Sequence, residues 1–449
     1  MIEKNKPIRL IELFAGIGSQ AKALKNLGAN FEHYKISEWE VNAAASYKAI
    51  HKENDTTDYS VGIASEELTE ILFNIGISTD GKKLMSLKEI NRKGEQWKRM
   101  VYNNFKATNN IGSILNVSGS DLGIVDTDKY TYVLTYSFPC QDLSNAGRGA
   151  GMEKGSGTRS GLLWEVERLL NECDELPQIL LMENVPQVHA KKNLEDFNKW
   201  ISFLESKGYS NFWQDLNAKD YGVPQNRNRC VMVSFLCKRS YTFPKPMPLN
   251  KTLGDLLDEE VEQHYYLTEE KCHKIANWKS QQNPLERVNG SNSISPTLTA
   301  RGAGEYHSGM VLVSPYLKNT ANLRGSILQR EVCSKAVDIT KPYEMIDYTY
   351  SNARLKEIQE GGVTVRNKND SSISCTLTTQ PYNFAVRIPD DMFRVLTPIE
   401  SWRLMGFDDA DFEKAAQVCD SAQLYKQAGN SIVVNVLMAI FKELFMKEV

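Results

Sequence analysis

Short apolar runs separated by amphipathic stretches dominate the first half of the chain. The runs are residues 8–13, a second ending near 36–38, 132–136, 178–182 and 230–235. Their length and their content of Val, Ile, Leu and Tyr predict buried β-strands. Residues 162–170 and the stretch before Gly28 instead repeat apolar positions with helical spacing. Strands that alternate with helices predict an α/β fold with a largely parallel, doubly wound sheet.

The pattern changes at three places along the chain. Residues from about 55 to 118 are mixed and polar, which predicts one or two extra helices inserted before the next strand. Dense proline marks a boundary near residue 243, after which short β-like runs and turns prevail. We therefore predict a first α/β part over 1–242, a smaller β-rich domain over 243–395 and a helical C-terminal part over 396–449.

Composition excludes several classes of protein. The 449 residues include 53 Lys and Arg against 56 Asp and Glu, with average apolar content, which excludes a disordered or collagen-like chain. The first ten residues are charged, and no run approaches about 18 apolar residues, so we expect neither secretion nor a membrane span. The eight cysteines form no C-x-x-C pair, which predicts reduced thiols, a cytoplasmic protein and no metal site.

A glycine-rich turn follows the first predicted strand. Gly16 and Gly18 precede a helix, where small residues let a ligand approach the backbone. Glu38 lies twenty positions beyond Gly18, at the end of the next strand, where a carboxylate can accept both hydroxyl hydrogens of a ribose. Trp39 can stack on a purine ring. A third glycine is missing, which favours an adenosine ligand over a dinucleotide; a tight turn without ligand is the alternative.

Four further polar residues stand beside predicted strands: Cys140 and Glu183 follow one, and Arg227 and Arg229 precede one. Cys140 precedes a glycine-rich stretch and is either an activated thiol or a small buried hydrophobe. Glu183 is either a surface carboxylate or an acid whose pKa burial raises until it can donate a proton near neutral pH. Arg227 and Arg229 have strand spacing, which predicts a shared face and a clamp for an anion or carbonyl; a solvated charged edge is the alternative.

Taken in order, these motifs resemble those of the DNA (cytosine-5)-methyltransferase family. The matching segments are Phe14-Ala-Gly-Ile-Gly18, Glu38-Trp39, Phe138-Pro-Cys-Gln141, Glu183-Asn-Val185, Gln225-Asn-Arg-Asn-Arg229, 394–407 and Gly429-Asn-Ser-Ile432. Their order follows the family along nearly the whole chain. The resemblance implies a Rossmann-like S-adenosylmethionine-dependent methyltransferase domain formed by residues 1–242 and 396–449. Residues 243–395 would be the β-rich target-recognition domain.

The resemblance also implies roles for single residues. Cys140 would form a covalent bond to C6 of cytosine, and Glu183 would donate a proton or a hydrogen bond to N3. Arg229 would bind O2 of the base, and Arg227 would support the loop. The cofactor would be S-adenosyl-L-methionine, leaving S-adenosyl-L-homocysteine, with no metal. The residues expected around it are Phe14, Gly16, Ile17, Gly18, Glu38, Trp39, Asp121, Leu122, Pro139, Leu163, Asn430 and Ile432.

The implied partner is double-stranded DNA. Chemistry on a base requires that the base rotate out of the DNA stack. The resemblance implies that the glycine-rich loop after Cys140 closes over the rotated cytosine. Arg148 and Arg159 are predicted to meet phosphates, with a solvated charge as the alternative. A Thr-Leu-Thr sequence occurs twice, and it predicts either DNA contacts or repeated scaffolding. Its threonines are Thr297, Thr299, Thr376 and Thr378.

Three functions follow from the sequence, in order of preference. The first is a sequence-specific DNA cytosine-5 methyltransferase, monomeric and cytoplasmic, that belongs to a bacterial restriction–modification system or is a solitary or phage-borne enzyme. A cognate restriction endonuclease, where one exists, would act separately. The second is an RNA cytosine-5 methyltransferase, which the sizeable region 249–390 disfavours because DNA readers need such a module. The third is a non-catalytic nucleic-acid-binding relative, which has no physical need for both Cys140 and Glu183 at strand ends.

Overall fold

The computed structural model describes residues 6–143, 151–266, 288–289, 294–298, 310–313 and 392–446. The chain divides into two compact units. One comprises Met1–Leu249 with Trp402–Val449, and the other comprises Asn250–Ser401. The second unit begins and ends a few residues later than the domain predicted over 243–395, and its role in target recognition stays a prediction.

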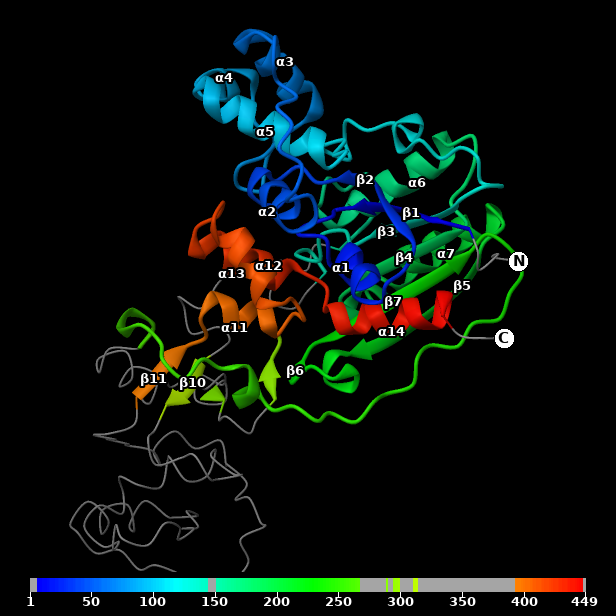
Figure 1. Ribbon diagram of the computed structural model, residues 1–449. Helices are drawn as coiled ribbons and strands as arrows, with labels where there is room; N and C mark the ends of the chain where they lie inside the picture. Colours follow the sequence, from blue (N-terminus) through cyan, green and yellow to red (C-terminus); the bar gives the residue numbers. More distant parts are fainter. Residues whose placement is uncertain are drawn as a thin grey trace, which may run out of the picture. The chain divides into compact units, whose positions relative to one another are not determined.

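A six-stranded sheet forms the centre of the first unit, in the order β2-β1-β3-β4-β7-β5 (Figure 1). The strands are β1 (Ile8–Leu13), β2 (Phe31–Ser37), β3 (Thr131–Tyr136), β4 (Ile179–Asn184), β5 (Ser210–Asn217) and β7 (Asn228–Phe235). Pairing is parallel from β2 to β4, as predicted. It is antiparallel from β4 to β7 and from β7 to β5, so the sheet is mixed.

The length of the connection explains why the largely parallel sheet becomes antiparallel at β7. The connection from β5 to β7 holds only η4 (Ala218–Tyr221) and β6 (Gln225–Asn226). A parallel crossover needs about a dozen residues or more, usually with a helix, whereas a short connection leaves neighbours antiparallel. The sequence also gave no sign of β5, because this strand is polar and partly exposed along most of its length.

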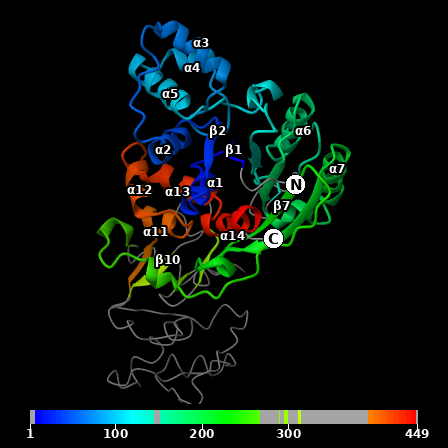
Figure 2. The same cartoon turned by 45° about the vertical axis from the view of Figure 1, so that its right-hand side comes forward.

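Helices cover the sheet and supply its core. They are α1 (Ser19–Asn26), α2 (Val41–His51), α6 (Leu163–Glu172), α7 (Leu194–Ser206) and α14 (Val434–Phe445). Buried residues of α6 and α7, such as Leu169 and Trp200, form one apolar cluster with Leu134 of β3 and Met182 of β4. The C-terminal helix α14 lies beside α1 in both ribbon views (Figures 1 and 2), which places the end of the chain within the first unit.

The inserted region contains three helices rather than the predicted one or two. They are α3 (Ser65–Ile75), α4 (Leu87–Asn91) and α5 (Glu95–Ala107). Five residues of α4 are too few to produce a visible helical period, although Ser86 and Glu89 form a capping box at its start. Leu68, Ile90 and Phe105 pack with Val41 of α2 in a small separate core.

The remaining elements are shorter. In the first unit they are η1 (Gly119–Leu122), η2 (Ser160–Leu162), η3 (Pro186–His189), α12 (Asp409–Ala416) and α13 (Ser421–Asn430); α11 (Pro398–Arg403) crosses the division between the units. In the second unit they are η5 (Leu253–Leu256), η6 (Gln263–Tyr265), β8 (Val288–Asn289), β9 (Ser295–Pro296), β10 (Met310–Val313) and β11 (Met392–Val395). There β10 pairs antiparallel with β11 and parallel with β8.

One stretch, Ser421–Phe445, is long and apolar enough to cross a membrane by composition alone, with a mean hydropathy of 1.4. Within its most apolar window, 61% is buried in the fold. The stretch also breaks at Ser431 between α13 and α14, and α14 packs on α1. Its apolar character is therefore explained by core packing.

Candidate active site

The glycine turn after β1 has two glycines with different requirements. Both have positive φ, 56° at Gly16 and 80° at Gly18, a conformation that side chains disfavour. A Cβ on Gly18 would collide with His51 and Tyr47, so packing requires this glycine. A Cβ on Gly16 would meet nothing within 4 Å. The backbone at Gly16 is therefore open to an approaching group, while Gly18 fixes the start of α1.

Glu38, just beyond the end of β2, faces this turn. Its carboxylate accepts the N–H of Gly16 at 2.9 Å and the N–H of Glu40 at 2.8 Å. Burial raises the pKa of Glu38 to about 7, and the two backbone hydrogen bonds oppose that rise. The half-buried side chain of Trp39 follows directly. The ends of β1 and β2 thus place an acceptor for hydroxyl groups next to an open glycine backbone.

Sequence reasoning missed the segment that borders Glu38 on the other side. Asn110 accepts the Glu38 N–H at 3.1 Å and donates its amide N–H to the Glu38 carbonyl at 2.9 Å. The Ser37 hydroxyl donates to the Gly112 carbonyl at 2.7 Å. The positive φ of Asn109 (50°) and Gly112 (85°) bends the chain here, so the Asn-Asn-Ile-Gly run was the available signal.

Asp121 and Leu122, predicted to meet an adenine, lie on η1. The Asp121 carboxylate accepts the backbone N–H of Ser118 at 2.8 Å and the Ser118 hydroxyl at 2.6 Å. Leu122 is completely buried in the core. The backbone of Glu38 is instead hydrogen-bonded to Asn110. A contact of Asp121 and Leu122 with the cofactor stays a prediction.

Cys140 lies on the loop after β3, which is held from both sides. The Ser160 hydroxyl donates to the carbonyl of Pro139 at 2.7 Å. The Asn184 amide, at the end of β4, donates to the carbonyl of Phe138 at 2.9 Å. Asn184, which belongs to the Glu183-Asn-Val185 motif, and Ser160 are positioning residues whose function the sequence did not indicate. Together they fix the backbone on which the half-buried Cys140 thiol is placed.

Glu183 and Arg229 form an ion pair beside this loop, with Arg229 Nε 3.0 Å from Glu183 Oε1. Glu183 belongs to the last residues of β4 rather than following the strand, and it is buried. Burial raises the pKa of Glu183, and the charges of Arg229 and Arg227 oppose that rise. Burial also raises the pKa of the Cys140 thiol; Arg229 and Arg227 lower it, and Glu183 raises it. The four groups therefore share one electrostatic environment.

Arg227 and Arg229 have different partners, although strand spacing predicted a shared face. Arg227 lies between β6 and β7, where the strand is interrupted. Its guanidinium donates to the carbonyls of Gly429 at 3.0 Å and Ser431 at 2.8 Å. Burial lowers the pKa of Arg227 to about 9. Arg227 thus anchors the end of α13, whereas Arg229 contacts Glu183.

The other predicted site residues are distributed as follows. Ile17, Leu163 and Ile432 are buried, Phe14 and Pro139 are half-buried, and Asn430 is exposed at the end of α13. Arg148, Thr299, Thr376 and Thr378 lie outside the described residues, and Thr297 is half-buried after β9. The guanidinium of Arg159, predicted to meet phosphate, donates to the Gln141 side chain and to the Gly81 carbonyl.

Comparison with known proteins agrees with this geometry. Residues 8–71 and 73–446 match the family model described as C-5 cytosine-specific DNA methylase. The chain is 32% identical over 442 residues to type II methyltransferase M2.ScrFI of Lactococcus lactis subsp. cremoris, covering 98% of this chain and 99% of that protein. It is 38% identical over 317 residues to orphan methyltransferase M.SssI of Spiroplasma monobiae, covering 67% and 81%.

Solved structures resemble the fold at low sequence identity. The methyltransferase EhMeth of Entamoeba histolytica matches with a TM-score of 0.57 and 14% identity, over 99% of this chain and 100% of that one. A DNMT2 mutant of Spodoptera frugiperda matches with a TM-score of 0.53 and 16% identity, over 97% and 99%. These similarities establish the Rossmann-like methyltransferase fold.

Proposed function

Because this chain belongs to the C-5 cytosine-specific DNA methylase family, we propose that it methylates C5 of cytosine within a specific duplex DNA sequence. The observation that carries the proposal is the position of Cys140 beside the Glu183–Arg229 ion pair. A thiol, a buried carboxyl group and a cation are the groups that activation of a cytosine ring requires. The preference for DNA over RNA follows from the family and its DNA methyltransferase relatives.

Cys140 would supply the nucleophile. Carbon 5 of cytosine is a weak nucleophile because its electrons belong to an aromatic ring. Addition of the Cys140 thiolate to C6 forms an S–C6 bond and moves an electron pair toward C5, which splits one difficult step into two easier ones. Once C5 carries the methyl group, its proton leaves to a base, the S–C6 bond breaks, and the free thiolate returns.

Glu183 and Arg229 would stabilise the ring during this addition. Negative charge develops at N3 and O2 when the thiolate adds. The burial that raises the pKa of Glu183 keeps its carboxyl group able to donate a proton or a hydrogen bond to N3. Arg229 would donate to O2 while its Nε holds Glu183 in place. Arg227 would act through the backbone of residues 429–431 and not on the base itself.

The glycine turn and Glu38 fit S-adenosyl-L-methionine, which supplies an electrophilic methyl group when bound. The open space at Gly16 admits a ligand close to the backbone. Glu38 would accept the ribose hydroxyls, and Trp39 would stack on the adenine. We place Asn110–Gly112 at this edge in preference to Asp121, because Asn110 contacts the Glu38 backbone directly. S-adenosyl-L-homocysteine would be the product.

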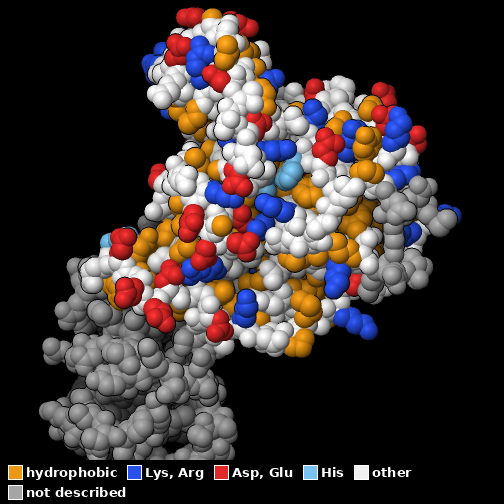
Figure 3. All heavy atoms as spheres, in the orientation of Figure 1, with side chains coloured by type: hydrophobic (Ala, Val, Ile, Leu, Met, Phe, Trp, Pro, Cys, Tyr) orange, Lys and Arg blue, Asp and Glu red, His pale blue; other side chains and the backbone are white. Residues whose placement is uncertain are grey.

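DNA recognition would divide between the two units. We propose that the unit Asn250–Ser401 reads base edges, with Thr297 and the second Thr-Leu-Thr segment among its candidates. The cytosine must rotate out of the duplex, at a cost of a few kcal/mol, to reach Cys140. Acidic and basic side chains are interspersed on the described part of the face shown in Figure 3. Basic and acidic residues are also nearly balanced between positions 249 and 390, and this balance predicts a modest dependence of DNA affinity on salt.

The bacterial relatives support a proposal for the biological setting. We propose a monomeric enzyme in the cytoplasm of a bacterium or of a phage-infected host, where its DNA substrate lies. Any cognate restriction endonuclease would act as a separate protein. Bisulfite sequencing of DNA from cells that express the chain tests this setting and identifies the target sequence, because it reports every methylated cytosine.

Trapping with 5-fluorocytosine tests the chemistry. Fluorine cannot leave C5 as a cation, so duplex DNA containing this base should remain bonded to Cys140 when S-adenosyl-L-methionine is present. Mass spectrometry should find one mass-shifted peptide containing Cys140, and none in Cys140→Ala. The variant should still bind DNA. An adduct at another cysteine would contradict the assignment.

A competition assay separates the two alternative functions, an RNA methyltransferase and a non-catalytic DNA-binding protein. Equal amounts of duplex DNA and tRNA are offered with labelled cofactor, and the methyl acceptor is identified. Transfer to tRNA alone would favour the RNA methyltransferase. Specific DNA binding with neither adduct nor transfer would favour a non-catalytic relative.

A further inference from the structure

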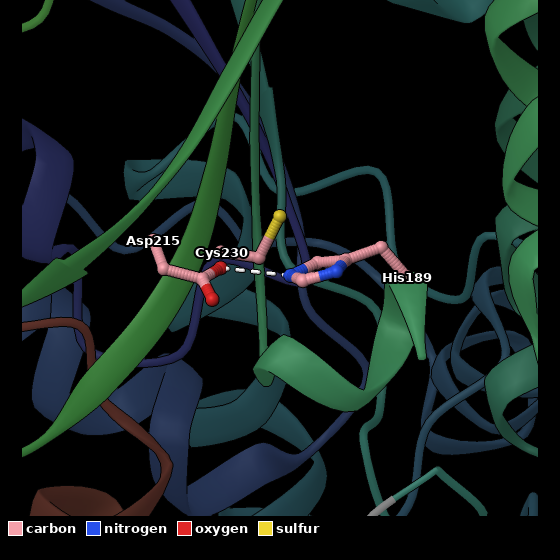
Figure 4. A group of neighbouring side chains, drawn as sticks. All are labelled: His189, Asp215 and Cys230. Atoms are coloured by element: carbon pink, nitrogen blue, oxygen red, sulfur yellow. Dashed lines mark hydrogen bonds and ion pairs between the residues drawn. The ribbon is translucent and has the colours of Figure 1, made fainter. Parts of the chain in front are cut away.

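A second cluster of chemically versatile side chains lies away from the proposed reaction (Figure 4). It consists of His189 on η3, Asp215 on β5 and Cys230 on β7. One donor atom of each lies within 4.8 Å of the others. His189 Nε2 is 2.9 Å from Asp215 Oδ1, and the Cys230 thiol lies beside this pair. The proposed methylation uses none of these three residues.

The fold fixes each member of the trio. Asp215 and Cys230 are direct partners in the antiparallel β5–β7 ladder, so their side chains share a face of the sheet. His189 reaches the same place from η3, and its ring lies against Trp213 with centroids 4.7 Å apart. Cys230 is completely buried, while the side chains of His189 and Asp215 are 22% and 32% exposed. The cluster is therefore prearranged, with one side accessible to water.

These donors suit a divalent metal ion of borderline softness. Thiolate sulfur, imidazole nitrogen and carboxylate oxygen are the three ligand types of zinc, and three protein ligands leave one position for water. Tetrahedral zinc with ordinary bond lengths places such donors about 3.3–3.6 Å apart. The present separations require adjustments of roughly an ångström, within the reach of side-chain rotation. Bound metal would replace the thiol proton, which leaves to solvent.

We propose that His189, Asp215 and Cys230 bind one Zn²⁺ ion, with water in the fourth position. The ion would join η3 to β5 and β7 at the antiparallel end of the sheet. Arg229 precedes Cys230 directly, and Asn184 pairs with Cys230 across β4 and β7. The metal would thus hold the strands that carry the Glu183–Arg229 pair. None of the three metal ligands takes part in the proposed methyl transfer, so metal binding and catalysis can be tested separately.

Metal uptake by the full chain, purified without a polyhistidine tag, tests the proposal. We expect about one zinc ion per chain after dialysis, measured by mass spectrometry of the metal. Co²⁺ in place of zinc should give a thiolate-to-cobalt charge-transfer absorption. Asp215→Asn and His189→Gln should weaken affinity by more than the roughly 10–100-fold that loss of an outer-shell partner costs. Cys230→Ala should abolish the cobalt absorption.

Two cysteine variants serve as matched controls. Cys140→Ala and Cys173→Ala each remove a half-buried thiol elsewhere in the first unit and should retain the metal. Absence of uptake by the unaltered chain overturns the proposal. Uptake that survives Cys230→Ala but is lost in Cys140→Ala also overturns it. If Cys230→Ala does not fold, the variants at the half-exposed Asp215 and His189 decide the question.

Discussion

Two buried carboxyl groups at the carboxyl ends of parallel strands in one sheet are stabilised in opposite ways. Glu38 is held by neutral donors, the N–H groups of Gly16 and Glu40. Glu183 is held by a cation, Arg229, at 3.0 Å. Burial raises the pKa of both, but only at Glu183 are arginine charges the leading opposing influence. A glutamate is thereby adapted to ligand binding at position 38 and to proton donation at position 183.

The difference indicates what each carboxyl group is suited to do. Neutral donors leave Glu38 with a pKa of about 7, so hydroxyl groups of a ligand readily draw it into the charged form. Arg229 gives Glu183 a fixed orientation and a counter-charge for the ring that it serves. Glu183→Gln should therefore affect the chemical step, whereas Glu38→Gln should affect cofactor binding.

The largest effect is expected from Glu183→Gln. An amide keeps the shape of the side chain but cannot pass a proton to N3, and loss of general acid catalysis typically costs about 10²–10⁴-fold in kcat. Single-turnover methylation of a defined duplex measures this loss. Cofactor affinity, measured by calorimetry, should stay unchanged. A variant with near-normal turnover would show that Glu183 only supports Arg229.

Glu38→Gln should act on binding instead. Hydrogen bonds to a charged acceptor contribute about 1.5–3 kcal/mol, so the Kd for S-adenosyl-L-methionine should rise roughly 10- to 150-fold. At saturating cofactor, kcat should be nearly normal. If the Kd is unchanged while kcat falls, the ribose is held elsewhere and the contrast between Glu38 and Glu183 is wrong.

The contact between Glu38 and the glycine turn was predictable, because adjacent parallel strands place their carboxyl ends at the same edge of the sheet. Strands β1 and β3 were found nearly to the residue, since both are apolar runs buried along most or all of their length. The family, too, was predicted from the order of the motifs and is confirmed by the comparisons.

What escaped prediction depended on tertiary partners. Polar β5 has no strand pattern of its own, since it pairs at the edge of the sheet with only part of its surface buried. Asn110 carries no motif, and its function depends on the bridge that its segment forms beside β2. The His189, Asp215 and Cys230 cluster is dispersed in sequence; the antiparallel β5–β7 pairing brings Asp215 to Cys230, and η3 adds His189.

A third prediction uses the pH dependence of cofactor binding. The folded pKa of Glu38 is raised from 4.5 to about 7, so the free protein loses stability as pH rises through that interval. A ligand that requires the carboxylate competes with the proton below pH 7. The cofactor Kd should therefore rise by up to about tenfold per pH unit as pH falls below 7, and level off above it.

Two variants identify the group that causes the pH dependence of the cofactor Kd. Glu38→Gln should give a flat profile. Glu12 also has a pKa raised to about 7 by burial, beneath the same turn, so Glu12→Gln is the matched control and should keep the slope. A slope that disappears only with Glu12→Gln would transfer the effect to that residue.

The smallest effect is expected at Arg159, which links the two ends of the site. Its guanidinium donates to Gln141 beside the nucleophile and to Gly81, in a turn whose Ser78 pairs with the backbone of Trp39. A forked side chain with two protein partners serves to position the Cys140 loop. Arg159→Gln should lower kcat by up to about tenfold, because only alignment is lost.

Salt dependence separates this positioning role from the phosphate contact that the sequence predicts. Removal of a phosphate-binding cation reduces the salt slope of DNA affinity by about one, and lysine would restore it. Removal of a positioning fork leaves the slope unchanged, and lysine restores little because it cannot reach both acceptors. We expect Arg159→Gln and Arg159→Lys to share a normal salt slope and a reduced kcat. Rescue by lysine with a restored slope would instead assign Arg159 to the DNA backbone.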